Sequence, residues 1–188
     1  MRPMPHGIQH LIRRRLMTTE PPSILETQYR HWPDEAACQR HAEALAARPA
    51  VRNSFIVLRG ELGAGKTTWV RHLLRALGVQ GRIKSPTYAL AEPYQVGGLA
   101  IHHFDFYRFN DPREWLDAGL RDIFEQPGLK LVEWAERAEG GLPTPDLRIT
   151  LDTSEGDSPE GPSGDAVDNA TRHVRLDALT PRGRELLT

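Results

Sequence analysis

The chain has 188 residues and a formal net charge of −1 with histidine neutral, so it lacks the general basic field that is typical of nucleic-acid binders. Its single cysteine, Cys38, excludes an intrachain disulfide and fits a reducing compartment. No apolar run approaches the ~20 residues of a membrane span, and we therefore expect a cytoplasmic protein with no membrane partner.

Residues 1–22 are basic, with no acidic residue before Glu20. They lack the continuous apolar centre of a secretory signal. We predict a disordered extension, for which Met17 offers an alternative start, and an organelle transit peptide is the other interpretation of this composition. Residues 23–188 are predicted to form a single domain.

The first predicted elements are a strand over residues 23–30 and a helix over residues 34–48. Pro33 and Asp34 are typical of a helix start, and Pro49 ends the helix. Within this segment Ala37, His41, Ala44 and Leu45 recur at helical spacing.

The segment GELGAGKT, residues 60–67, matches the phosphate-binding pattern G-x-x-x-x-G-K-[ST]. An apolar run, 54–59, precedes it as a predicted strand, and a predicted helix over 67–77 follows. The glycines let successive backbone N–H groups turn toward an anion, and the helix dipole faces the same point. In this pattern Lys66 reaches the β- and γ-phosphates and the Thr67 hydroxyl ligates Mg²⁺. The alternative is a glycine-rich turn that binds nothing.

That predicted helix should bury Val70, Leu73, Leu74 and Leu77 on one face. Arginine supplies nearly all the positive charge, since only three of the 24 basic residues are lysine. A lysine at position 66 is therefore unlikely to be an accident of composition.

Two later strands are predicted to end in a carboxylate: Asp105 in strand 99–106 and Glu133 in strand 128–134. In such sheets ligands bind beyond the carboxyl ends of the strands, and a buried acid needs a partner, which a Mg²⁺–phosphate site supplies. A carboxylate that caps the next turn is the alternative. Trp134 could stack on a base or a partner, or pack in the core.

Ser85 and Thr87 flank Pro86 in a segment that is either switch-like or a rigid turn. A short helix is predicted over 111–120, and strands over 146–151 and 171–179 form a terminal pair. Residues 152–170, with six acidic and no basic residues, are predicted to be a mobile hairpin loop. The alternation of helices and short strands predicts a three-layer, P-loop NTPase-like α/β domain. Its central sheet should be mainly parallel, with a C-terminal antiparallel strand pair.

Several motifs occur in one order along the chain. They are PDE at 33–35, GELGAGKTT at 60–68, KSPTYAL at 84–90, HHFDFYR at 102–108, LVEW at 131–134 and LPTPDLRI at 142–149. In this combination the chain closely resembles the TsaE family, also called YjeE. The phosphate loop is shared by many families, whereas SPTY followed by HFD-x-YR and EW is more specific. Departures from the family pattern are the basic start, the acidic 152–170 insert and Cys38.

The resemblance implies a weak Mg²⁺-dependent ATPase that is required for threonylcarbamoylation of the adenosine beside the anticodon of tRNAs. ATP and Mg²⁺ are the implied cofactors. Homologues of TsaD and TsaB are the implied partners, and tRNA is reached through their complex.

The family pattern also implies residue roles. Catalytic roles fall on Lys66, Asp105 and Glu133, and Mg²⁺ ligation on Thr67 and Glu133. Trp134 matches a functionally sensitive tryptophan. Nucleotide binding is expected from Glu35, Leu62, Gly63, Ala64, Gly65, Lys66, Thr67, Thr68 and Arg172.

A small-molecule or nucleoside kinase is the alternative function, because it would use the same loop. It also needs a lid whose arginines clamp the transferred phosphate, and only Arg108 and Arg121 are loose candidates. A GTPase would show Asn-Lys-x-Asp for guanine, which does not occur here, so ATP is the expected nucleotide.

Overall fold

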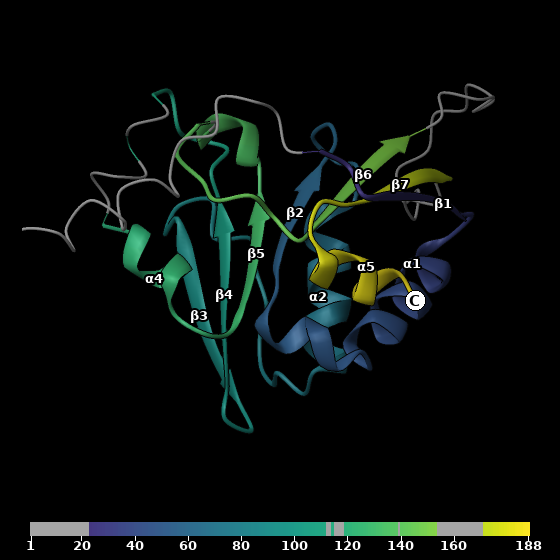
Figure 1. Cartoon of the computed structure of the whole chain (residues 1–188), viewed down its shortest axis with the longest axis horizontal. Helices are drawn as coiled ribbons and strands as arrows, with labels where there is room; N and C mark the ends of the chain where they lie inside the picture. The colour runs from purple at the N-terminus through teal and green to yellow at the C-terminus, as the bar shows by residue number, and fades with distance from the viewer. Residues whose placement is uncertain (1–22, 112–113, 115–118, 139, 154–170) are drawn as a thin grey trace, which may run out of the picture.

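The computed structural model describes residues 23–111, 114, 119–138, 140–153 and 171–188 (Figure 1). The predicted N-terminal extension, most of the predicted 111–120 helix and most of the acidic segment lie outside these residues. Of the acidic segment, Asp152 and Thr153 are described, and both belong to a strand instead of the predicted loop.

One seven-stranded sheet organises the described part of the chain, in the order β1-β7-β6-β2-β5-β4-β3. Strands β6, β2, β5 and β4 run parallel, while β1, β7 and β3 join antiparallel. The predicted α/β fold, with its parallel centre and its antiparallel β6–β7 pair, is confirmed. The strands are β1 (Glu26–Trp32), β2 (Phe55–Arg59), β3 (Ala91–Val96), β4 (Leu99–Asp105), β5 (Leu129–Glu133), β6 (Leu147–Thr153) and β7 (Arg172–Ala178).

Helices α1, α2 and α5 lie beside one half of this sheet, near β2, β6, β7 and β1, whereas α4 lies near β3 and β4 in the other half (Figure 1). Their bounds are α1 (Glu35–Ala46), α2 (Lys66–Ala76), α4 (Arg121–Glu125) and α5 (Pro181–Leu187), with short 3-10 helices η2 (Pro49–Asn53) and η3 (Ala135–Ala138). Helix α5 was not predicted, although Thr180 and Pro181 are ordinary start signals: the Thr180 hydroxyl accepts from Gly183 N.

Helix α1 begins as predicted, with the Asp34 carboxylate accepting from Ala37 N at 2.7 Å. Its buried face, however, consists of Cys38, Ala42 and Leu45. Of the residues at the predicted helical spacing, Leu45 is buried, Ala37 and His41 are partly buried, and Ala44 is exposed. Small residues at 38 and 42 let α1 approach its neighbours closely, which the apolar spacing alone did not indicate.

The two faces of the sheet carry separate apolar clusters, so the central strands are buried on both sides. In β2, Ile56 and Leu58 join the cluster that contains α1 and α2, while Phe55 and Val57 join the cluster on the other face. This explains the continuous apolar run that preceded the glycine loop in the sequence. Helix α2 buries Trp69, Val70, Leu73 and Leu74, and Leu77 is partly buried against the same cluster.

Within the described residues, no helix combines the length and the apolar character that crossing a membrane would require.

Candidate nucleotide site

The glycine-rich loop joins the end of β2 to the start of α2, as the sequence predicted. Gly65 caps α2 in the left-handed conformation, with φ of 100°. Gly60 has φ of 141°, and a Cβ there would lie 2.4 Å from the carbonyl oxygen of Leu151. Both positions therefore favour glycine for backbone shape, and Gly60 also requires it for close packing of the loop on β6.

Lys66 lies almost entirely inside this loop, with 5% of its surface exposed. Its ammonium donates to the carbonyl oxygens of Gly60 at 2.6 Å and Glu61 at 2.8 Å. Nζ also lies 4.0 Å from the centre of the Trp134 ring. Burial lowers the pKa of Lys66, and nearby carboxylates, with Glu133 foremost, oppose that shift. The loop thus holds one buried cation at its centre.

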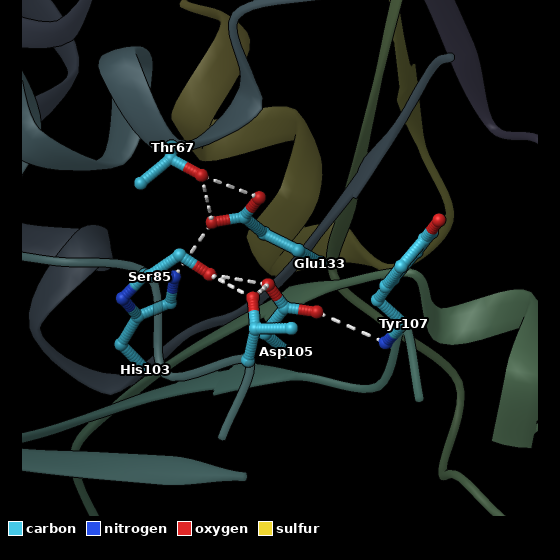
Figure 2. Close-up of polar contacts among 7 residues, drawn as sticks. Thr67, Ser85, His103, Asp105, Tyr107 and Glu133 are labelled. Atoms are coloured by element: carbon cyan, nitrogen blue, oxygen red, sulfur yellow. Dashed lines mark hydrogen bonds and ion pairs between the residues drawn. The ribbon is translucent and has the colours of Figure 1, made fainter. Parts of the chain in front are cut away.

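The Thr67 hydroxyl and the Glu133 carboxylate meet at the end of β5 (Figure 2). Thr67 Oγ1 lies 2.9 Å from each carboxylate oxygen of Glu133. In the β4–β5 register Glu133 is opposite Asp105, so the two strand-end carboxylates are neighbours. A hydroxyl and a carboxylate beside a phosphate loop are the oxygen ligands that Mg²⁺ uses together with phosphate, so this pair fits the metal.

Asp105 points into the 84–88 segment (Figure 2). Its Oδ2 accepts from Thr87 Oγ1 at 2.7 Å and also from Ser85 Oγ. Its Oδ1 accepts from the backbone N–H of Tyr107 at 2.9 Å. Asp105 therefore caps the turn after β4, and it also ties the Ser85–Thr87 segment to the edge of the site.

His103 is a residue of this site that the sequence analysis did not single out. It is fully buried, and its Nε2 lies 2.8 Å from Glu133 Oε1 (Figure 2). The available signal was its position two residues before Asp105, because alternate residues of a strand share one face.

Trp134 has a backbone conformation that is rare for a bulky residue, with φ of 59°. Its ring lies over Lys66 and beside Tyr107, whose ring centre is 5.1 Å away. The residue is half-buried at the mouth of the loop, so it is neither a simple core residue nor a free surface ring.

A small hollow of about 120 Å³ opens beside the loop. Its lining consists of Trp32, Glu35, Cys38, Gly65, Thr68, Leu151 and Arg172. The structure thus brings together Glu35, Thr68 and Arg172, which lie far apart in the sequence. Burial raises the pKa of the Cys38 thiol to about 12, so the thiol stays protonated and chemically quiet.

Arg172 also braces the loop directly, because its Nε donates to the carbonyl oxygen of Ala64 at 3.0 Å. Glu35 Oε1 lies 2.9 Å from His72 Nε2 on α2. Leu62, by contrast, is 74% exposed at the tip of the loop. All the predicted site residues therefore lie on or around the glycine loop and the adjoining strand ends.

The parallel strands, the glycine loop between β2 and α2 and the paired strand-end carboxylates define a P-loop NTPase-like protein. Residues 32–160 match the family described as "Threonylcarbamoyl adenosine biosynthesis protein TsaE". The chain belongs to this TsaE family, as its motifs predicted.

Individual relatives agree with this assignment. The chain is 40% identical to the tRNA threonylcarbamoyladenosine biosynthesis protein TsaE of Haemophilus influenzae over 132 residues, which cover 68% of this chain and 84% of the relative. It is 36% identical to the protein of the same name from Bacillus subtilis, with 63% and 72% covered. The crystal structure of Bacillus subtilis YdiB superimposes with a TM-score of 0.66 at 25% identity, and the match covers 86% of this chain and 92% of YdiB.

Proposed function

We propose that this protein binds ATP with Mg²⁺, hydrolyses it slowly, and by doing so supports threonylcarbamoylation of tRNA by a complex of TsaD and TsaB homologues in the cytoplasm. The observation that carries the proposal is the contact between Thr67 and Glu133, at 2.9 Å, next to the buried Lys66. It places a hydroxyl, a carboxylate and an ammonium around one phosphate-binding loop.

Each part of the site has a distinct task in this proposal. Lys66 and the loop N–H groups bind the β- and γ-phosphates, and Thr67 with Glu133 would hold Mg²⁺. When bound, the metal supplies charge neutralisation on the phosphate oxygens. Glu35 and Arg172, which line the adjoining hollow, would contact the rest of the nucleotide.

The Ser85–Thr87 segment links this site to the surface. The Asp105 carboxylate holds the segment by accepting a hydrogen bond from Thr87, while the neighbouring Tyr88 is 86% exposed. We propose that nucleotide binding and hydrolysis change the position of this segment and of Trp134, so that the partner complex meets two different surfaces.

Nothing in the described residues favours the kinase alternative. Arg108 lies over the Tyr88 ring, 4.1 Å from its centre, and Arg121 pairs with Glu125 at 3.8 Å. Both arginines thus contact these side chains, and neither contact supports the phosphate clamp that a kinase needs.

The nucleotide part of the proposal is tested by replacing Lys66→Ala. Because the fixed charge on the phosphates is lost, we expect ATP affinity to fall by roughly tenfold or more, which corresponds to about 1.5–3 kcal/mol. Calorimetric titration with Mg²⁺–ATP measures this. Arg52→Ala is the matched control, since it removes one exposed positive charge from η2, which precedes β2, whereas the glycine loop follows β2. Equal ATP affinity of wild type and Lys66→Ala would contradict the assignment.

The partner part is tested with the purified TsaB–TsaD pair from the same organism. We expect tighter binding of this protein to the pair with ATP than without it. With tRNA and threonylcarbamoyl-adenylate present, wild type should raise the yield of modified tRNA over many turnovers, whereas Glu133→Ala should not. If wild type neither binds the pair nor changes this yield, phosphorylation of added small acceptors becomes the next test.

A further inference from the structure

The buried histidine in β4 contacts the site from the side opposite the glycine loop. His103 is 0% exposed, and its Nε2 lies 2.8 Å from Glu133 Oε1. From the other side Thr67 Oγ1 donates to the same carboxylate. Glu133 is therefore held between one group from β4 and one group from α2 (Figure 2).

The strand register explains why this histidine reaches its partner. His103 and Asp105 are alternate residues of β4, and so both side chains project from the same face of the sheet. Asp105 is opposite Glu133 in the register, and His103 is opposite Leu131, two residues before Glu133 in β5. Phe104 lies between them in sequence and joins the apolar cluster on the other face.

The hydrogen bonds of the ring define its role. A carboxylate only accepts, so Nε2 must be the donor to Glu133. Nδ1 has no hydrogen-bond partner among the described residues. The ring therefore makes a single polar contact, and that contact is with the carboxylate predicted to bind the metal.

We infer that His103 is a positioning residue, which fixes the Glu133 carboxylate in the orientation needed to hold Mg²⁺ together with Thr67. The inference rests on the proposed Mg²⁺–ATP function. A carboxylate ligand that is hydrogen-bonded by its surroundings binds metal better than a free one, and loss of such a partner costs roughly 10–100-fold in metal affinity. Without His103, Glu133 would be buried with Thr67 alone to orient it.

The test separates metal-dependent from metal-independent nucleotide binding. His103→Leu should weaken ATP binding in Mg²⁺ by roughly tenfold or more, with ATP binding in EDTA changed by less than about threefold. Calorimetry gives both affinities, and electron paramagnetic resonance of Mn²⁺ titrated with ATP and protein reports the metal directly. His102→Leu is the matched control, because this neighbouring histidine lies beside Phe104 and projects to the other face.

Two conservative variants keep the test decisive if His103→Leu folds poorly. Gln places an amide N–H close to the position of Nε2, whereas the shorter Asn does not reach Glu133. His103→Gln should therefore retain most of the Mg²⁺-dependent affinity, and His103→Asn should lose it.

Three results would overturn the inference. The first is equal Mg²⁺-dependent affinity of the Gln and Asn variants. The second is an equal loss in Mg²⁺ and in EDTA for His103→Leu, and the third is a His103→Leu variant that binds like wild type. If wild type itself binds no ATP in either condition, the proposed function fails and the inference fails with it.

Discussion

Trp134 shows at the scale of one residue how a strained backbone serves the candidate site. Its φ of 59° directs the chain away from β5 immediately after Glu133. In this conformation the indole covers Lys66 and lies beside Tyr107. A left-handed conformation costs a residue with a Cβ about 1–2 kcal/mol, so the contacts of the ring must offset that cost.

This strain predicts that glycine at position 134 gives a more stable protein than alanine, the reverse of the usual order. Trp134→Gly and Trp134→Ala both remove the ring, but only alanine retains the Cβ that opposes positive φ. We expect the glycine variant to have the higher free energy of unfolding, by about 1 kcal/mol. Urea titration of both variants measures the difference. An alanine variant as stable as the glycine variant would show that the backbone carries no strain at this position.

At the scale of elements, the Ser85–Thr87 segment is connected to the sheet through Asp105. The hydroxyls of Ser85 and Thr87 donate to the Asp105 carboxylate. Two backbone hydrogen bonds add to this connection. Leu90 N donates to Pro86 O at 2.7 Å, and Asp105 N donates to Leu90 O at 3.2 Å. A segment that changes position with the nucleotide needs a connection of this kind, one that can open without unfolding β4.

Asp105→Ala should loosen this segment locally. Hydrogen bonds to a charged group are worth about 1.5–3 kcal/mol, so the amide of Leu90 should exchange with solvent roughly tenfold faster or more. Hydrogen exchange followed by NMR measures this amide. The β5 amides of Leu131 and Val132 are the internal control and should keep their protection. Equal acceleration of the β5 amides would mean that Asp105 stabilises the whole sheet and does not act on the segment.

For the molecule as a whole, the contact between α1 and α2 makes stability depend on pH. Trp69 Nε1 donates to His41 Nδ1 at 3.0 Å, which requires an unprotonated Nδ1. Burial, helped by Arg30, lowers the pKa of His41 from 6.5 to about 4. The folded state therefore resists protonation, while the unfolded state binds a proton below pH 6.5. The contribution of neutral His41 to the free energy of unfolding is fully present above pH 6.5. It decreases as the pH falls from 6.5 toward 4.

Between pH 7 and pH 5 this linkage should reduce the free energy of unfolding by about 2 kcal/mol. Urea titrations at the two pH values measure the loss. His41→Asn is the reference, because its amide oxygen occupies the place of Nδ1, can accept from Trp69 and does not titrate. We expect the variant to lose less stability over this interval than wild type does. Equal losses would contradict the lowered pKa of His41.

Local patterns were sufficient to predict the parallel centre of the sheet and the glycine loop between β2 and α2. The glycine loop has a fixed spacing of residues. Asp105 and Glu133 lie close together because the carboxyl ends of neighbouring parallel strands lie at the same end of the sheet. His103 was not predicted, because its contact with Glu133 depends on the register between β4 and β5. The face of α1 and the conformation of Trp134 depend on packing, which no periodicity in the sequence records.

The brace between Arg172 and the glycine loop has a consequence for synthesis of the protein. The two ends of that hydrogen bond, Arg172 Nε and Ala64 O, are 108 residues apart in the chain. While a ribosome is still translating the intervening codons, the loop of a nascent chain already contains every residue of its motif but lacks this brace. If the protein binds ATP as proposed, we therefore expect full nucleotide affinity to appear only after β7 has emerged and paired with β6.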